Sequence, residues 1–213
     1  MAAMSTRGHS IVIEGHDGTG KSTQAALLVK WLQNKGIQTF EAHEPAGTPL
    51  ADKLREIIKD GTLERDPHTD LLLFTAARIE IAKQEEAALA SGKWVIKARN
   101  WLSTLAYQGS GSGVSTTTIE SVTKQFLPNF YLHPSLQIVL YVPQEVRRAR
   151  ISLRGLNEPN DTFESKDVMF QERVANAYET IAQDRNALLL DASPSIDELH
   201  ATITHIIETQ FNV

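Results

Sequence analysis

The chain has 213 residues, of which 41% are hydrophobic and 22% charged, and this size and composition fit one globular domain with a substantial core. It contains no cysteine, which excludes a disulfide framework, a thiolate metal site and a cysteine nucleophile. A net charge of −5 argues against nucleic-acid binding through a broad basic surface. No run approaches the roughly 18 apolar residues of a membrane span, and residues 1–9 hold no apolar leader segment, so we expect a cytoplasmic protein without membrane contact.

A strand, a loop and a helix are predicted in succession near the N-terminus. Residues 10–14 form a short β-branched run that ends at Gly15. The next apolar residues recur at helical spacing, at Ala25, Leu28, Val29 and Leu32. Between these elements, GHDGTGKS at 15–22 matches the phosphate-binding pattern G-x-x-x-x-G-K-S/T, in the strand-to-helix setting that the pattern requires.

This pattern, the P-loop, predicts a site for ATP. Its glycines let successive backbone N–H groups converge on phosphate oxygens, and the helix N-terminus adds its dipole. The ammonium group of Lys21, a predicted catalytic residue, can reach the β- and γ-phosphates, and the hydroxyl of Ser22 can ligate Mg²⁺. P-loops serve ATPases, GTPases and kinases alike, so the acceptor must be found elsewhere. The predicted ATP-binding residues are Gly15, His16, Asp17, Gly18, Thr19, Gly20, Lys21, Ser22 and Thr23.

Strands and helices alternate along the rest of the chain. Further strands are predicted at 39–42, 94–97, 136–142 and 187–190, and helices at 50–59, 70–90, 119–126, 145–153, 167–184 and 196–211. This alternation indicates a parallel sheet, so we expect an α/β protein with the P-loop NTPase fold, a five-stranded parallel sheet surrounded by helices. Two segments rich in Gly, Ser, Asn or Pro, 109–118 and 155–162, are predicted to be mobile loops, the second acting as a small lid over a ligand.

Four blocks of sequence resemble bacterial thymidylate kinases, in the order and spacing of that family. They are IEGHDGTGKST at 13–23, HEPAGTPL at 43–50 with a following Arg55, LLFTAAR at 72–78, and Arg99 with STLAYQG at 103–109. They are similar to the family patterns I-E-G-x-D-G-x-G-K-S-T, R-E-P-G-G-T-x-L, L-L-F-x-A-x-R and D-R-Y-x-x-S-x-x-A-Y-Q-G. The resemblance covers nearly everything after residue 9.

The resemblance implies an enzyme that transfers the γ-phosphoryl group of MgATP to thymidine 5′-monophosphate (TMP). It implies one nucleoside-monophosphate-kinase-like domain over 9–213, with a lid over about 147–165, and a homodimer packed through long helices. Residues 1–8 are expected to form a disordered tail. No nucleic-acid or membrane partner is expected.

For the phosphate and sugar of the acceptor, the resemblance implies five residues. Arg55 and Arg99 would hold the 5′-phosphate, because arginine offers a fixed fork of donors to phosphate oxygens, and Arg99 would also act in catalysis. Tyr107 would lie under the sugar and disfavour a 2′-hydroxyl. Asp17 and Glu44 would lie near the sugar and the phosphates.

For the base of the acceptor, the resemblance implies four residues. Phe74 would stack on the thymine ring and supply contact area. Arg78, Thr104 and Gln108 would hydrogen-bond the edge of the ring and supply selectivity.

An arginine-rich helix precedes the predicted lid. Arg147, Arg150 and Arg154 lie at i, i+3 and i+7 on one face, with Arg148 beside them, and a solvated helix face is the alternative interpretation. In the family, members with glycine at the position of Gly18 bring a lid arginine to the transferring phosphoryl group. Arg150 and Arg154 are therefore predicted to be catalytic, because positioned cations stabilise the transition state of phosphoryl transfer.

The sequence departs from the family pattern at the D-R-Y aspartate, which is Ala98 here. The attacking oxygen belongs to a phosphate whose second pKa is about 6, so no general base is required. The positioning of Mg²⁺ and Arg99 should suffer, and we expect a slowed enzyme. Other departures are His43 for arginine, Ala46 for glycine, and Ser135 and Tyr141 for aspartate.

Three alternatives follow from the residues. A nucleoside kinase would need a carboxylate base and little positive charge near the acceptor, and Arg55 and Arg99 argue against it. A nucleotide-binding pseudokinase would retain Lys21 and Ser22, and only Ala98 and Tyr141 support it. A kinase for another pyrimidine monophosphate, such as one with uracil, stays open because stacking on an aromatic ring is indifferent to a methyl group.

Overall fold

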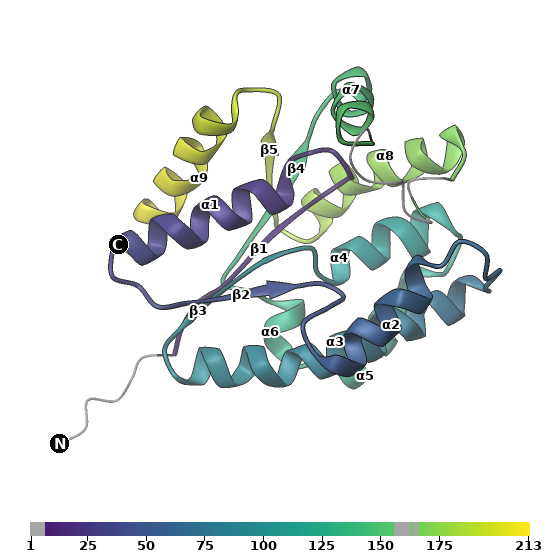
Figure 1. The fold of residues 1–213 in the computed structure, drawn as a ribbon, viewed down its shortest axis with the longest axis horizontal. Coiled ribbons are helices and arrows are strands. Elements are labelled where there is room, and N and C mark those ends of the chain that lie inside the picture. The colour runs from purple at the N-terminus through teal and green to yellow at the C-terminus, as the bar shows by residue number, and fades with distance from the viewer. Residues whose placement is uncertain (1–6, 156–162, 164–165) are drawn as a thin grey trace.

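Five parallel strands form the centre of the structure, a computed structural model that describes residues 7–155, 163 and 166–213 (Figure 1). The strands lie in the order β2-β3-β1-β4-β5. Every pair is parallel, so the predicted five-stranded parallel sheet is confirmed. The strands are β1 (Ser10–Gly15), β2 (Thr39–His43), β3 (Trp94–Ala98), β4 (Leu136–Tyr141) and β5 (Leu188–Asp191).

Helices cover both faces of the sheet (Figure 1). One face carries α1 (Lys21–Asn34) and α9 (Ile196–Phe211), which also contact each other. The opposite face carries α3 (Pro67–Ala90) and α8 (Val168–Asp184), and α2 (Pro49–Lys59) packs on α3. The remaining helices are α4 (Trp101–Thr104), the π-helix η1 (Leu105–Gly111), α5 (Thr116–Phe126), α6 (Asn129–Leu132) and α7 (Gln144–Gly155).

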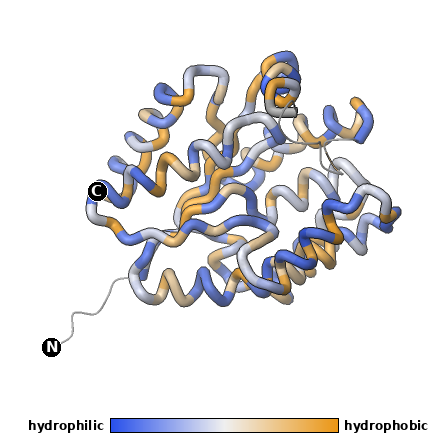
Figure 2. Tube along the Cα trace, in the orientation of Figure 1, coloured by the Kyte–Doolittle hydropathy of each residue, from blue (hydrophilic) through white to orange (hydrophobic). Residues whose placement is uncertain are grey.

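Burial of the sheet on both faces explains its apolar strands, which form the hydrophobic centre of Figure 2. In β4, Ile138 packs in the core beneath α1 and α9, whereas Val139 points into the core on the opposite face. In an open parallel sheet of this kind, ligands bind at the carboxyl ends of the strands, outside the sheet. The P-loop leaves β1 at that end.

Several helices begin earlier than predicted, because a capping residue precedes the apolar pattern. The Thr48 hydroxyl accepts from the Ala51 amide at 3.1 Å, and α2 begins at Pro49. Asp66 and Ser115 cap α3 and α5 in the same way. The predicted loop over 109–118 is wrong at both ends, since η1 extends to Gly111 and α5 begins at Thr116.

The predicted tail and lid lie partly outside the described residues, at 1–6, 156–162 and 164–165. At the described end of the tail, Arg7 forms an ion pair with Glu86 at 2.7 Å, and the Gly8 amide donates to the Leu89 carbonyl at 2.9 Å. No helix within the described ranges is long and apolar enough to cross a membrane.

Candidate active site

The P-loop joins β1 to α1 and depends on glycine at two positions. Gly15 has a φ of 136°, and a Cβ atom there would lie 2.3 Å from the Leu140 carbonyl oxygen, so no other residue fits. Gly20 precedes α1 in a left-handed conformation, with a φ of 93° and no side-chain cap. The first N–H groups of α1 are therefore not occupied by a cap, which is the arrangement that binds phosphate.

Lys21 lies folded over the loop. Its ammonium group donates to the His16 carbonyl at 2.7 Å and lies 3.8 Å from an Asp17 carboxylate oxygen. The Thr19 hydroxyl donates to the same carbonyl at 2.9 Å. Ser22 and Thr23 follow at the exposed start of α1, and Ser22 lines the pocket described below. These contacts hold the loop in the shape that the motif predicts.

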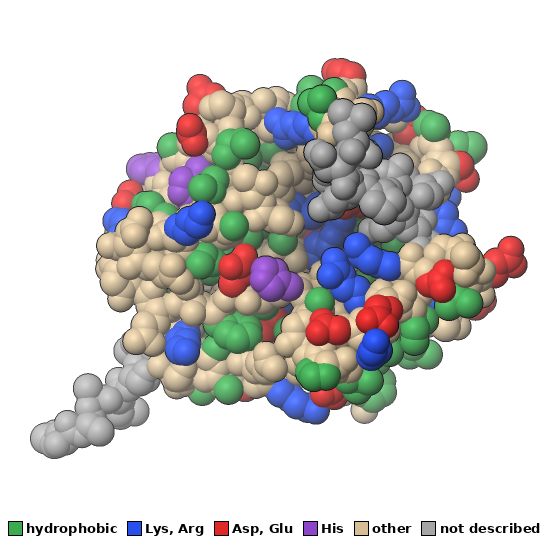
Figure 3. All heavy atoms as spheres, in the orientation of Figure 1, with side chains coloured by type: hydrophobic (Ala, Val, Ile, Leu, Met, Phe, Trp, Pro, Cys, Tyr) green, Lys and Arg blue, Asp and Glu red, His purple; other side chains and the backbone are tan. Residues whose placement is uncertain are grey.

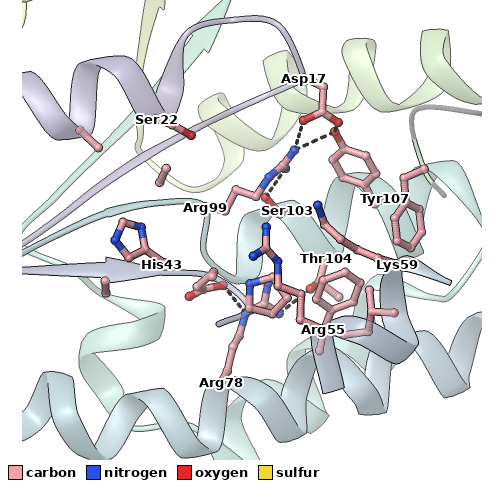
Figure 4. A pocket seen from close by; sticks show the side chains of 18 of the residues that line it. Asp17, Ser22, His43, Arg55, Lys59, Arg78, Arg99, Ser103, Thr104 and Tyr107 are labelled. Carbon is pink, nitrogen blue, oxygen red and sulfur yellow. Dashed lines mark hydrogen bonds and ion pairs between the residues drawn. The ribbon is translucent and has the colours of Figure 1, made fainter. Parts of the chain in front are cut away.

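Asp17 joins the P-loop to the segment after β3 (Figure 4). The Arg99 guanidinium donates to one Asp17 carboxylate oxygen, and the Tyr107 hydroxyl donates to the other at 2.5 Å. Burial acts to raise the pKa of Asp17, but Arg99 and Lys21 outweigh it and hold that pKa well below its usual range. Asp17 is therefore ionised and fixes the direction of Arg99.

Arg99 has a strained backbone, with a φ of 74°. A left-handed conformation costs a residue other than glycine about 1–3 kcal/mol, and such strain is found where a side chain must be aimed at a site. The second guanidinium nitrogen donates to the Ser103 hydroxyl at 3.1 Å, and the group lies over the Tyr107 ring at 5.1 Å. Arg99 is thus held on three sides.

Glu14, at the end of β1, organises the turn that follows β3. Its buried carboxylate accepts from the backbone amides of Asn100 at 2.6 Å and Ser103 at 3.0 Å, and from the Ser103 hydroxyl at 2.7 Å. Burial raises the pKa of this carboxyl group, although the Ser103 hydrogen bond opposes the shift. Through Ser103, Glu14 supports the position of Arg99.

Arg78 of α3 is held by three partners at the floor of the pocket. Its guanidinium donates to Glu44 at 2.7 Å, to the Thr104 hydroxyl at 2.7 Å and to the Asn100 carbonyl at 2.9 Å. Glu44 and Arg78 are both almost fully buried as an ion pair. The arrangement fixes Thr104 as well as Arg78, and a guanidinium has five N–H donors, so two of the five can still serve a ligand.

Lys97 extends this ion pair into a buried cluster. Its ammonium group lies 2.9 Å from Glu85 and 3.4 Å from Glu44, and 3.4 Å from the centre of the Tyr131 ring. The cluster therefore contains two cations and two carboxylates, which avoids an uncompensated buried charge. Lys97 thus supports Glu44 as well as Glu85.

One pocket of about 430 Å³ brings the predicted acceptor residues together. Cationic side chains gather in this hollow of the surface (Figure 3), and Figure 4 shows Arg55 and Lys59 of α2 pointing into the pocket toward Arg99. Ser22 and Ala98 line the same pocket, so the acceptor and P-loop regions are continuous. The nine predicted residues that line it are Asp17, Glu44, Arg55, Phe74, Arg78, Arg99, Thr104, Tyr107 and Gln108.

Gln108 carries a distinctive signal of ligand binding. It is 2% exposed, it lines the pocket, and its amide nitrogen has no hydrogen-bond partner among the described residues. An unpaired buried donor is costly, and a ligand acceptor would relieve that cost. Gln108 lies in η1, and single-turn π-helices occur frequently at functional sites.

Among the pocket residues to which the sequence assigned no role, three have side chains suited to bind or shape a ligand site: Lys59, Ser103 and Phe163. Lys59 lies one helical turn after Arg55 on α2, and that i, i+4 spacing is a signal that could have found it. Ser103 belongs to the fourth block of the resemblance but was given no role. Phe163 lies within the predicted lid, and its ring packs 5.9 Å from that of Phe74.

Of the arginines before the predicted lid, Arg147 and Arg150 are described and do not line this pocket. Arg147 packs against the P-loop, where a Cβ atom on Gly18 would lie 3.2 Å from its Cγ. Arg150 donates to the Ala192 carbonyl, after β5, at 2.9 Å. The side chain of Arg154 lies outside the described part of the chain. The structure therefore does not bring Arg147 or Arg150 to the acceptor pocket.

The lowered pKa of the buried His16 predicts how the stability of the fold depends on pH. Burial and the nearby Arg147 lower its pKa from 6.5 to about 4. Between these values the unfolded chain binds a proton that the folded chain does not, so stability falls as the pH drops from 6.5 toward 4, by about 3 kcal/mol in all. Urea unfolding should show that the free energy of unfolding falls between pH 7.5 and pH 5.0 by about 2 kcal/mol more in wild type than in His16→Gln. Equal losses would contradict the prediction.

Comparison with known proteins shows similarity along most of the chain. A sequence model of the family described as Thymidylate kinase matches residues 13–203. A protein named thymidylate kinase from Baumannia cicadellinicola subsp. Homalodisca coagulata is 39% identical over 203 residues, which cover 93% of this chain and 94% of that protein. Thymidylate kinases from Idiomarina loihiensis and Legionella pneumophila (strain Paris) are 37% and 36% identical, over 94% and 96% of this chain and 97% and 96% of their own lengths.

Proposed function

Because the chain belongs to the thymidylate kinase family, we propose that its P-loop and its acceptor pocket are the two halves of one phosphoryl-transfer site. The protein is a nucleoside monophosphate kinase that transfers the γ-phosphoryl group of ATP to TMP, giving dTDP and ADP. One observation carries the proposal: the nine acceptor residues implied by the sequence line a single pocket that Ser22 of the P-loop also lines.

The residues at 15–23 fit the triphosphate of ATP. The uncapped start of α1 supplies N–H groups, and Lys21 supplies a cation beside them. Ser22 would ligate Mg²⁺, and no carboxylate stands at Ala98 to assist it. When bound, Mg²⁺ neutralises charge on the phosphate oxygens. We assign His16 and Asp17 to the shape of the loop, because both are engaged in contacts within the protein.

The acceptor phosphate is assigned to the cations that converge in the pocket. Arg55 and Arg99 would bind its oxygens, and Lys59 adds a third positive charge. A terminal phosphate oxygen of TMP forms a bond to the γ-phosphorus of ATP while the bond to the bridging oxygen breaks, and the electron pair leaves with ADP. The attacking oxygen is already ionised near neutral pH, so the residues need only orient it and balance charge.

The base is assigned to the aromatic side of the pocket. Phe74 would stack on thymine, Gln108 would donate its unpaired amide hydrogen to a carbonyl of the ring, and Arg78 and Thr104 would bond the same edge. Tyr107 is held by Asp17 and would lie under the sugar. These roles account for both the burial and the polarity of the pocket.

Two further parts of the proposal rest on the family resemblance. Arg150 or Arg154 would reach the transferring phosphoryl group, which requires Arg150 to exchange its contact with the Ala192 carbonyl for the substrate. The protein would act as a homodimer in the cytoplasm. Exposed apolar side chains on the two packed helices α2 and α3, such as Leu50, Ile57 and Leu72, are compatible with a dimer surface.

A panel of monophosphates with MgATP tests the proposed function. We expect the highest kcat/KM with TMP, and about tenfold less with dUMP, because loss of one methyl group in a pocket is worth about 1–3 kcal/mol. Purine monophosphates should react more slowly still. A coupled assay for ADP measures the rates, and calorimetry measures binding. A better rate with another monophosphate would correct the substrate, and binding of both nucleotides without ADP formation would indicate a pseudokinase.

A further inference from the structure

A hydrogen-bonded bridge links the P-loop to the far wall of the acceptor pocket. The His16 ring nitrogen Nε2 lies 2.8 Å from Gln171 Oε1, and Gln171 Nε2 donates to the Phe163 carbonyl at 2.6 Å. We call these two contacts the His16–Gln171 bridge. His16 is 4% exposed and Gln171 is 8% exposed, so water does not compete for either bond. Neither side chain lines the acceptor pocket itself.

The chemistry of the bridge fixes its direction. A carbonyl oxygen accepts only, so Gln171 must present its amide nitrogen to Phe163 and its amide oxygen to His16. That oxygen accepts only as well, so Nε2 of the neutral His16 ring carries the hydrogen. His16 Nε2 is therefore the donor of one hydrogen bond, and Gln171 Nε2 is the donor of the other. The bridge cannot be reversed without losing a bond.

Gln171, the middle residue of the bridge, lies on a rigid element, the helix α8. Gln171 lies in the first turn of α8, where the Asp167 carboxylate accepts from the Phe170 amide at 2.7 Å and the Asp167 carbonyl accepts from the Gln171 amide at 3.1 Å. The capped turn fixes the backbone of Gln171. Its side chain can then hold Phe163 at a defined distance from the P-loop.

The Phe163 ring completes the aromatic side of the acceptor pocket. Its centre lies 5.9 Å from that of Phe74 and 5.8 Å from that of Tyr107, edge to face with the latter. Phe163 lines the pocket and is 8% exposed. A ring in this position limits the width of the space beside Phe74, which is the proposed place of the base.

We propose that Phe163 is a further acceptor-binding residue, and that Gln171, held by His16, is the residue that positions it. The inference rests on the proposed function, since it gives Phe163 a role toward the base of TMP. The His16 Nδ1 atom is buried without a partner in the described part of the chain, which costs free energy. His16 belongs to the P-loop, but its ring faces Gln171 of α8, so its role is toward the acceptor and not toward ATP.

The test compares KM values for TMP and ATP in Gln171→Met, which keeps the size of the side chain and removes both bonds of the bridge. We expect KM for TMP to rise about tenfold, with KM for ATP and kcat within about twofold of wild type. Phe163→Ala should raise KM for TMP at least as much. The double variant should be no worse than Phe163→Ala alone, because Gln171 acts through Phe163.

Gln24→Met is the matched control, because Gln24 is also a buried glutamine that donates to a backbone carbonyl, that of Ile196 at 2.9 Å, and it does not contact Phe163. Its KM for TMP should stay at the wild-type value. An unchanged KM for TMP in Gln171→Met, or additive losses in the double variant, would overturn the inference. If Gln171→Met does not fold, an unchanged KM for TMP in Phe163→Ala overturns it. Failure of wild type to bind TMP would instead remove the proposed function, and the inference with it.

Discussion

Replacing Lys21 by methionine is expected to lower kcat by about 10²–10³-fold, the effect of removing one positioned donor from a charged transition state. Lys21 is 6% exposed, and its ammonium group is held within the loop by the His16 carbonyl. Lys21 is the first residue of α1, and no side chain caps the start of this helix. Methionine fills similar space but offers no charge to the phosphate oxygens.

Steady-state rates with MgATP and TMP measure this loss, and calorimetry measures the affinity for ATP. Lys30→Met is the control, because Lys30 lies on the same helix, is exposed and does not line the pocket. Its rate should match wild type. A Lys21→Met enzyme with more than a tenth of the wild-type kcat would show that the triphosphate is held in another way, and the donor half of the site would have to be assigned again.

The sheet could be predicted from the sequence because both of its faces are buried. Buried strands are short apolar runs, and their alternation with helices leaves a parallel arrangement as the simplest solution. Helix starts were less predictable from the apolar spacing alone, because the first turn of a helix is often polar. Thr48-Pro49 and Asp66-Pro67 are capping signals that define those starts, and Ser115 is a third cap.

The π-helix η1 could not be predicted from local sequence. Its segment contains Gly109 and Gly111, which favour a loop on propensity. Packing reverses that preference: a Cβ atom on Gly111 would lie 2.6 Å from the Phe170 ring, so the glycine allows α8 to approach. The element that carries Tyr107 and Gln108 into the pocket therefore depends on a contact between residues distant in sequence.

The candidate site was predictable in membership but not in arrangement. The motif blocks named nine acceptor residues that line the pocket, because each block ends a strand or faces the same edge of the sheet. They did not indicate that Arg78 is held by Glu44 and Thr104, or that Lys97 supports that pair. Such contacts depend on side-chain directions in the folded chain, and a single sequence does not encode them in its spacing.

Ala98 leaves the end of β3 without a carboxylate beside the cations that line the pocket. It ends β3, pairs with Ile13 of β1 and His43 of β2, and lines the pocket together with Ser22. Two carboxylates of the pocket are already committed, since Asp17 is engaged by Arg99 and Tyr107, and Glu44 is engaged by Arg78. A carboxylate oxygen near Ser22 is the kind of ligand that Mg²⁺ prefers, and the end of β3 supplies none at Ala98.

Ala98→Asp is therefore expected to raise kcat by about tenfold or more and to lower the Mg²⁺ concentration needed for half-maximal rate. The cations Arg55, Lys59 and Arg99 line the same pocket and would compensate the added charge. Rates measured across a Mg²⁺ titration separate the two effects. Ala98→Asn is the matched control, because it has the same size without the charge, and equal gains in both variants would indicate better packing. An unchanged rate in Ala98→Asp would mean that this chain does not use the carboxylate, and an absence of transfer in both wild type and Ala98→Asp would contradict the catalytic assignment.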